Sequence, residues 1–237
     1  MIKKTHEPLA NFTWDEGPVV LLARHGETEK NAARLHDRDG ASDFVQGVGL
    51  NVPLNERGRK QAKRQGIVLG SFLVERHLSL ASIHSSDAKR AIDTRDIAVN
   101  AGGLEAPMYP PDSRLREISK GDFEGKRRSE VYSPDERERQ QYEDWEFRHS
   151  NGETAAKAGA RYKQWFLDAY ESARDSPQSA VIAFGHNLVT SYGIAQLLGG
   201  DKLPDMRSTT NFKVDNGSAL VVARRTGKWV VSHLKAN

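Results

Sequence analysis

The 237-residue sequence contains no cysteine, which excludes disulfide bonds, thiolate zinc sites and thiol nucleophiles together. It also lacks any apolar run long enough to cross a membrane, and residues 1–17 contain no apolar stretch of the signal-peptide kind. We interpret residues 1–17 as a polar N-terminal extension and residues 18–237 as a single domain. The absence of cysteine fits a reducing compartment, so we expect a cytoplasmic protein with no membrane partner.

Blocks of charge of one sign are scarce as well. Lys and Arg number 35 against 32 Asp and Glu, a net charge of +3, and the two signs alternate along the chain, as in residues 135–139. A nucleic-acid-binding surface needs basic residues clustered on one face, so we expect no nucleic-acid partner. The eight histidines lack the close spacing of a metal motif such as His-x-x-x-His, and we expect no metal site and no cofactor.

Short apolar runs alternate with helical patterns along the sequence. The expected strands are 19–23, 80–85, a short one at 108–109, 181–184, and a closing hairpin of 218–223 with 229–233. The expected helices are 55–76, 87–100, one that begins near Ser133-Pro134, one after a capping box at 150–153 that would account for Glu153, and one over 188–198. This alternation predicts an α/β three-layer sandwich with a mostly parallel central sheet flanked by helices.

An arginine and a histidine stand side by side where the first strand ends. The guanidinium group of Arg24 matches phosphate oxygens, and the imidazole of His25 is a nucleophile when it is neutral. Gly26 allows a sharp turn and a close approach of the backbone to a ligand. His186 also follows a strand, and Arg90 lies in the first turn of another helix. Ligands of such sheets bind at the carboxyl ends of strands, so we expect these side chains to converge there.

Six ordered segments carry a resemblance to a known family. They are residues 22–28, 53–58, 85–91, 115–118 with 121–125, 152–154 and 184–187. In these segments the chain resembles the histidine phosphatase superfamily, the phosphoglycerate-mutase-like group. The resemblance extends over residues 19–223 and implies the fold of that group, with one catalytic domain.

The resemblance also implies a role for each matching residue. His25 would be the nucleophile that becomes phosphorylated, and Glu117 the proton donor to the leaving alcohol. The rest of the phosphate pocket would consist of side chains that donate hydrogen bonds, namely Arg24, Asn31, Arg90 and His186. Further substrate contacts are implied at Gln46, Gly47 and Asn187.

Elementary chemistry agrees with these roles. A phosphomonoester carries about two negative charges at neutral pH, which two arginines and a second histidine can offset. A carboxylic acid with a raised pKa can protonate the departing alkoxide. Asp122 and Glu124 are close to Glu117 in the sequence, and either could replace it as that acid. For each of these site residues the alternative is a purely structural role, for example as a buried histidine in the core or as a polar residue at a helix terminus.

Two segments depart from the family pattern. The pair Gln46-Gly47 comes late within the polar loop 34–53, and Asn51 stands where an acid is common in the family. Residues 125–152 do not resemble the longer insert of the mutases and look more like the phosphatase branch. We therefore expect a metal-independent phosphomonoester hydrolase that acts on a small organic phosphate through a phosphohistidine.

Two other functions stay open. One is a 2,3-bisphosphoglycerate-dependent phosphoglycerate mutase, which would use the same phosphohistidine but keep water away from it. The other is a non-catalytic module that binds a phosphate ligand. The sequence does not determine the oligomeric state, for which a homodimer is one option.

Overall fold

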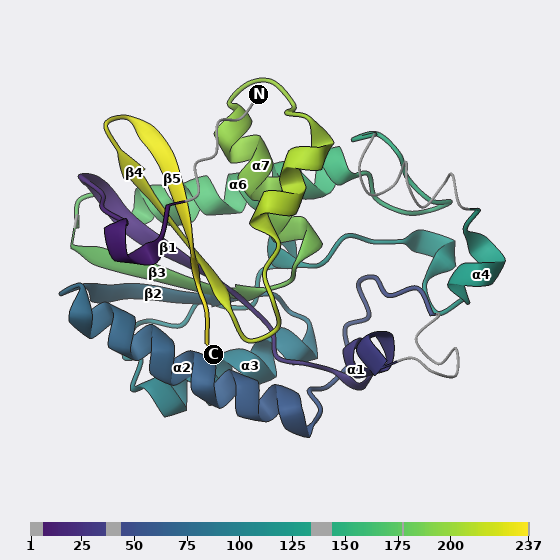
Figure 1. Ribbon diagram of the computed structural model, residues 1–237, viewed down its shortest axis with the longest axis horizontal. Coiled ribbons are helices and arrows are strands. Elements are labelled where there is room, and N and C mark those ends of the chain that lie inside the picture. Colours follow the sequence, from purple (N-terminus) through teal and green to yellow (C-terminus); the bar gives the residue numbers. More distant parts are fainter. Residues whose placement is uncertain (1–6, 37–43, 134–143, 177, 237) are drawn as a thin grey trace.

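The computed structural model describes residues 7–36, 44–133, 144–176 and 178–236 of the chain (Figure 1). At its centre is a five-stranded sheet with the strand order β2-β3-β1-β4-β5. The strands are β1 (Glu16–Arg24), β2 (Ser79–Ser85), β3 (Ser179–Gly185), β4 (Ala219–Arg225) and β5 (Lys228–Leu234). Strands β2, β3 and β1 are parallel, whereas β4 is antiparallel to both β1 and β5. All strands except β4 therefore run in one direction, which confirms the mixed, mostly parallel sheet of an α/β fold.

Helices cover both faces of this sheet. The α-helices are α1 (Glu29–His36), α2 (Glu56–Glu75), α3 (Lys89–Gly102), α4 (Arg128–Val131), α6 (Ala155–Ser172) and α7 (Leu188–Gly199). Short 3-10 turns are η1 (Leu9–Asn11), η2 (Ser113–Leu115), η3 (Gly121–Phe123) and η4 (Met206–Phe212). Figure 1 shows α2 and α3 on one face and α6 and α7 on the other, which gives the three layers. Across the described ranges no helix has both the length and the apolar character to span a membrane.

Strand β1 is buried on both sides, which explains its uninterrupted apolar run. Val20 and Leu22 belong to the core beneath α6 and α7. Val19, Leu21 and Ala23 belong to the opposite core beneath α2 and α3. Each fully buried Val or Leu contributes about 1.5–3 kcal/mol relative to an exposed one, so this strand is a rigid support for whatever follows Arg24.

The described part of the polar N-terminal segment packs against the domain. The backbone N–H of Glu7 donates to the carbonyl oxygen of Val231 in β5, and the Phe12 side chain is fully buried. Arg76, at the end of α2, donates to the carbonyl oxygens of Phe12 and Leu9 at 3.0 and 2.7 Å. These contacts close the edge of the core between α2 and the hairpin.

The expected capping box at residues 150–153 is wrong. Helix α6 begins at Ala155, and its cap is Thr154, whose side chain accepts from the backbone N–H of Lys157 at 3.1 Å. Asn151 has a left-handed backbone conformation (φ 57°), so residues 149–152 form a turn instead of a helix start. The short strand expected at 108–109 is reduced to a single bridge between Met108 and Ile83. The helix expected to begin near Ser133-Pro134 falls on residues outside the described ranges.

The register of the parallel strands brings their carboxyl ends together. Arg24 at the end of β1 pairs with Gly185 at the end of β3, and Ser85 at the end of β2 pairs with Phe184. The residues that follow these three strands therefore meet at one edge of the sheet.

Candidate active site

A cavity of about 310 Å³ lies at this edge. It is lined by the residues that the sequence singles out: Arg24, His25, Asn31, Gln46, Gly47, Arg90, Glu117, His186 and Asn187. It is also lined by residues that the sequence analysis did not anticipate, including Lys120, Arg128, Tyr132, Lys213 and Asp215. Segments far apart in the chain thus converge on one pocket with an excess of positive charge.

The imidazole of His25 is held in one tautomer. Its Nδ1 atom is 2.6 Å from the carbonyl oxygen of Gly26. A carbonyl oxygen only accepts, so Nδ1 carries the proton and Nε2 keeps its lone pair. Burial lowers the pKa of His25 well below its ordinary value, and the charges of Arg90 and Arg24 lower it further. A neutral imidazole with an unprotonated Nε2 is suited to nucleophilic attack.

The turn after His25 is packed directly onto the start of α2. A Cβ atom on Gly26 would lie 2.3 Å from the carbonyl oxygen of Gly58, and one on Gly58 would lie 2.0 Å from that of Glu27. Asn55 donates its backbone N–H to the Glu27 carbonyl at 3.0 Å and caps α2 by accepting from the Gly58 N–H at 2.8 Å. The Pro53–Gly58 motif therefore fixes the backbone that carries His25.

A second histidine lies beside the first. The rings of His25 and His186 meet edge to face, with centroids 5.2 Å apart and planes inclined by 64°. The Nε2 atom of His186 is 3.0 Å from the hydroxyl oxygen of Ser86, which follows β2. Burial lowers the pKa of His186 well below its ordinary value, and the charge of Arg90 adds to this effect. Both imidazoles are therefore neutral at physiological pH. Ser86 was not anticipated as a partner.

The two arginines are held by backbone carbonyls of the loops around the cavity. Arg24 donates to the carbonyl oxygen of Val214 at 2.8 Å. Arg90, buried in the first turn of α3, donates to the carbonyl oxygens of Gly49 at 2.6 Å and Val48 at 3.3 Å. Two guanidinium groups are thus fixed at the edge of the pocket, where they can bind an anion.

Asn31 and the late Gln46-Gly47 pair meet in spite of the inserted loop. The Oδ1 atom of Asn31 accepts from the N–H and hydroxyl of Thr28 at 3.2 and 3.0 Å. Its Nδ2 group is therefore the end that can donate, and it lies 3.5 Å from Oε1 of Gln46. A Cβ atom on Gly47 would lie 2.0 Å from Oε1 of Glu124, so the Glu124 carboxylate packs directly against the backbone of Gly47.

Glu117 lies at the N-terminus of α7. Its Oε1 accepts from the backbone N–H groups of Ile118 and Val189 at 3.0 and 2.9 Å, and its Oε2 from that of Leu188 at 3.1 Å. Oε2 accepts one hydrogen bond and Oε1 two, so Oε2 is the oxygen with more room for a further hydrogen bond or a proton. Glu117 is in the cavity lining and Asp122 and Glu124 are not; the other carboxyl group in the lining is Asp215.

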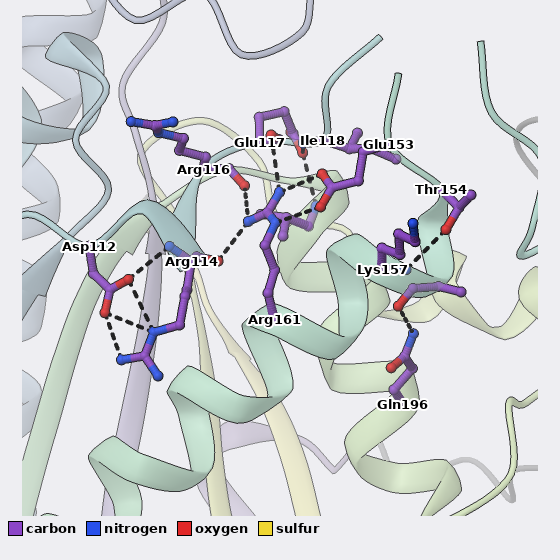
Figure 2. Close-up of polar contacts among 12 residues, drawn as sticks. Asp112, Arg114, Arg116, Glu117, Ile118, Glu153, Thr154, Lys157, Arg161 and Gln196 are labelled. Atoms are coloured by element: carbon purple, nitrogen blue, oxygen red, sulfur yellow. Dashed lines mark hydrogen bonds and ion pairs between the residues drawn. The ribbon is translucent and has the colours of Figure 1, made fainter. Parts of the chain in front are cut away.

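The loop that carries Glu117 is held from α6, as Figure 2 shows. Arg161 donates from Nη1 to the carbonyl oxygens of Arg114 and Arg116 at 2.7 and 2.8 Å, and from Nη2 to that of Glu117 at 3.3 Å. The carboxylate of Glu153 accepts from Nε and Nη2 of Arg161, both at 2.8 Å. Glu153 is thus a partner of Arg161 and not part of a capping box. The family resemblance included residues 152–154 and so singled out Glu153, but nothing in the sequence indicated that Arg161 is its partner.

The fold and the pocket define an α/β enzyme with a cationic site at the carboxyl ends of parallel strands. The sequence model of the histidine phosphatase superfamily (branch 1) matches residues 20–237. The chain belongs to this family.

Individual relatives include phosphatases and a mutase-like protein. The chain is 30% identical over 210 residues to the fructose-2,6-bisphosphatase TIGAR of Xenopus tropicalis, across 86% of this chain and 70% of that protein. It is 28% identical over 230 residues to the probable phosphoglycerate mutase GpmB of Escherichia coli, across 92% and 95% of the two chains. The native structure of a mycobacterial glucosyl-3-phosphoglycerate phosphatase superposes with a TM-score of 0.70 at 25% identity, across 91% and 97%.

Proposed function

We propose that the protein hydrolyses a small phosphomonoester, without a metal ion, through a phosphohistidine at Nε2 of His25. The observation that carries this proposal is the hydrogen bond of 2.6 Å between Nδ1 of His25 and the Gly26 carbonyl, in a pocket that also contains Arg24 and Arg90. It leaves an unprotonated Nε2 beside two fixed cations. The phosphatase names among the relatives support hydrolysis as the reaction.

The proposed reaction has two steps. In the first, the Nε2 lone pair of His25 forms a P–N bond while the P–O bond to the alcohol breaks, and the carboxyl group of Glu117 gives its proton to the departing oxygen. In the second, a water molecule attacks phosphorus, the P–N bond breaks, and the Glu117 carboxylate takes up the water's proton. Arg24, Arg90 and His186 stabilise the charge on the phosphoryl oxygens in both steps.

The decisive experiment concerns His25. His25→Ala should remove nearly all phosphate release from an aryl phosphate, and no phosphoryl group should be trapped on the variant after an acid-free quench. His77→Asn is the matched control, because His77 is exposed and outside the cavity lining. Activity of the wild-type enzyme should survive exhaustive chelation with EDTA. A folded His25→Ala variant with normal turnover would exclude the mechanism, and no turnover by the wild type would favour the binding module.

A mutase reaction is the second candidate. The similarity to the probable phosphoglycerate mutase GpmB favours it, and the proposed phosphohistidine would serve either reaction. The two reactions differ in whether water reaches the intermediate before the product alcohol returns. We favour hydrolysis because residues 125–152 do not resemble the mutase insert, and because the loop 34–53, which borders the pocket in the family, departs from the family pattern.

A further inference from the structure

The cavity contains more positive charge than one phosphoryl group needs. Besides Arg24 and Arg90, three basic residues line it, namely Lys120, Arg128 and Lys213. Lys120 is unusual among them because only 6% of its surface is exposed. A lysine that is buried to this degree normally has an anionic partner, since removing an ammonium group from water is costly.

Lys120 forms no direct ion pair among the described residues, although three glutamates are near enough for their charges to act on it. Its backbone N–H donates to Oε1 of Glu124 at 2.9 Å, and within the described ranges its Nζ has no hydrogen bond to a carboxylate or carbonyl oxygen. Burial lowers the pKa of Lys120 to about 8, while the charges of Glu117, Glu124 and Glu153 act to raise it. At neutral pH the side chain is therefore mostly a cation in the wall of the cavity, with hydrogen bonds left to donate.

The position of Lys120 indicates which part of a substrate it would contact. Glu117, the proposed proton donor, marks the side of the pocket where the alcohol leaves. Lys120 follows it by three residues in the same loop, and the two side chains are close enough for Glu117 to influence the ammonium group. Lys120 therefore belongs to the leaving-group side, whereas His25, Arg24 and Arg90 surround the phosphoryl group.

We propose that Lys120 forms a second anion-binding subsite, so that the preferred substrate is a phosphomonoester whose alcohol part carries another anionic group. A carboxylate or a second phosphate provides the oxygens that an ammonium group binds. The inference rests on the proposed function, because it places the phosphate to be cleaved at His25. It adds a substrate class and a residue that selects it.

Matched substrates test the subsite. The carboxylate pair is 3-phosphoglycerate and glycerol 3-phosphate, and the bisphosphate pair is fructose 1,6-bisphosphate and fructose 6-phosphate. In at least one pair, wild type should prefer the member with the additional anionic group, 3-phosphoglycerate or fructose 1,6-bisphosphate, by about tenfold or more in kcat/KM, as one charge-assisted hydrogen bond would give. The pair that shows the preference identifies the second group as carboxylate or phosphate.

Three variants assign the preference to Lys120. Lys120→Met should lose about tenfold or more on the member with the additional anionic group, mainly through KM, and less than about twofold on the member without it. Lys120→Arg should keep most of the preference, and Lys126→Met, at an exposed lysine outside the cavity lining, should keep all of it. Equal losses on both members, or a wild type without preference in either pair, would overturn the proposal.

Equilibrium binding separates this proposal from the proposed function. If no substrate releases phosphate, the hydrolase assignment fails, and calorimetric titration of wild type and Lys120→Met with the same compounds decides the subsite. Tighter binding of the member with the additional anionic group to wild type, and not to Lys120→Met, would support it. Equal binding of both members to wild type would exclude it. Circular dichroism of each variant checks that it is folded.

Discussion

Arg161 and Glu153 form a two-point ion pair, with both donor–acceptor distances 2.8 Å, while the remaining N–H groups of Arg161 hold the backbone of residues 114–117. The two side chains are mostly shielded from solvent, with 22% and 21% of their surface exposed, and they do not line the cavity. Its contact with the site is through the backbone of Glu117. It is therefore a positioning device for the proposed proton donor.

Arg161→Met should slow alkyl phosphates more than activated aryl phosphates, because a displaced Glu117 protonates the leaving group poorly. Stability should also fall by about 1–3 kcal/mol, since buried carbonyl oxygens lose their donors. Glu153→Gln keeps one acceptor for Arg161 and should have a smaller effect of the same kind. The measurement is log kcat against leaving-group pKa for each variant. An unchanged slope in Arg161→Met would limit the ion pair to a structural role.

Glu117→Gln should lower kcat for alkyl phosphates by about 100-fold or more, the contribution usual for general acid catalysis, and affect activated aryl phosphates much less. The single amide oxygen of glutamine can still accept from the N–H groups of Ile118 and Val189, while the N–H of Leu188 loses its acceptor, so the loop should keep most of its hydrogen bonds. Equal slowing of both substrate classes would transfer the role to Asp215, the other carboxyl group in the cavity lining, or to water.

The neutral histidines predict a pH dependence of stability. The pKa values of His25 and His186 are lowered in the folded protein, so below about pH 6.5 the unfolded chain binds protons that the folded chain does not. The free energy of unfolding should therefore fall as pH drops from 7.5 to 5.5, by about 1.4 kcal/mol per pH unit for each such histidine below pH 6.5. Urea unfolding of wild type and His25→Asn measures it. For His25→Asn, the free energy of unfolding should fall less steeply with decreasing pH, because the contribution of one histidine is missing. Equal slopes for wild type and variant would mean that the pKa of His25 is not lowered in the folded protein.

Gly58→Ala should destabilise the protein and reduce activity, because the new Cβ atom would lie 2.0 Å from the Glu27 carbonyl oxygen. Relief of this overlap requires a shift of the turn that carries His25, at a cost of about 1–3 kcal/mol or more. Gly185→Ala provides the comparison, since its Cβ atom would first meet the Leu115 carbonyl oxygen at an ordinary 3.7 Å. Thermal unfolding should show the larger loss for Gly58→Ala. The reverse order would contradict the role given to this contact.

Hydrolysis and isomerisation can be compared in one tube. With 3-phosphoglycerate we expect phosphate to appear faster than 2-phosphoglycerate, with or without 2,3-bisphosphoglycerate as primer, because residues 125–152 do not resemble the mutase insert that would keep water from the proposed phosphohistidine. Both products are measured over the same time course. Isomer formation that far exceeds phosphate release and requires the primer would identify a mutase.

The sequence predicted those parts of the molecule that depend on local pattern. The run 181–184 indicates a strand covered on both faces, and β3 is buried along its length. His25, Arg90 and His186 could be expected to converge because each follows or begins an element at the same edge of the sheet. Their neutral or charged states follow from burial, which only the packed structure reveals.

Contacts across long sequence separations could not be predicted. Ser86 and His186 meet 100 residues apart, and Gly58 packs on Glu27 through backbone atoms that leave no side-chain pattern. Lys120 lies in a polar loop where a lysine is ordinary, and only its burial distinguishes it. The capping-box error has a local origin instead: Asn151 adopts a left-handed conformation, so residues 149–152 form a turn and α6 begins only at Ala155.

The carbonyl groups that hold the two arginines bear on how this enzyme could change its substrate. Val214 and Gly49 contact Arg24 and Arg90 through main-chain oxygens, which every residue type possesses. Replacements of side chains in these loops can therefore reshape the rim while these backbone contacts to the two guanidinium groups stay in place. A library of variants confined to residues 209–215 should yield altered specificities at a higher frequency than inactive proteins, a degree of evolvability that comes from holding the cations through main-chain oxygens.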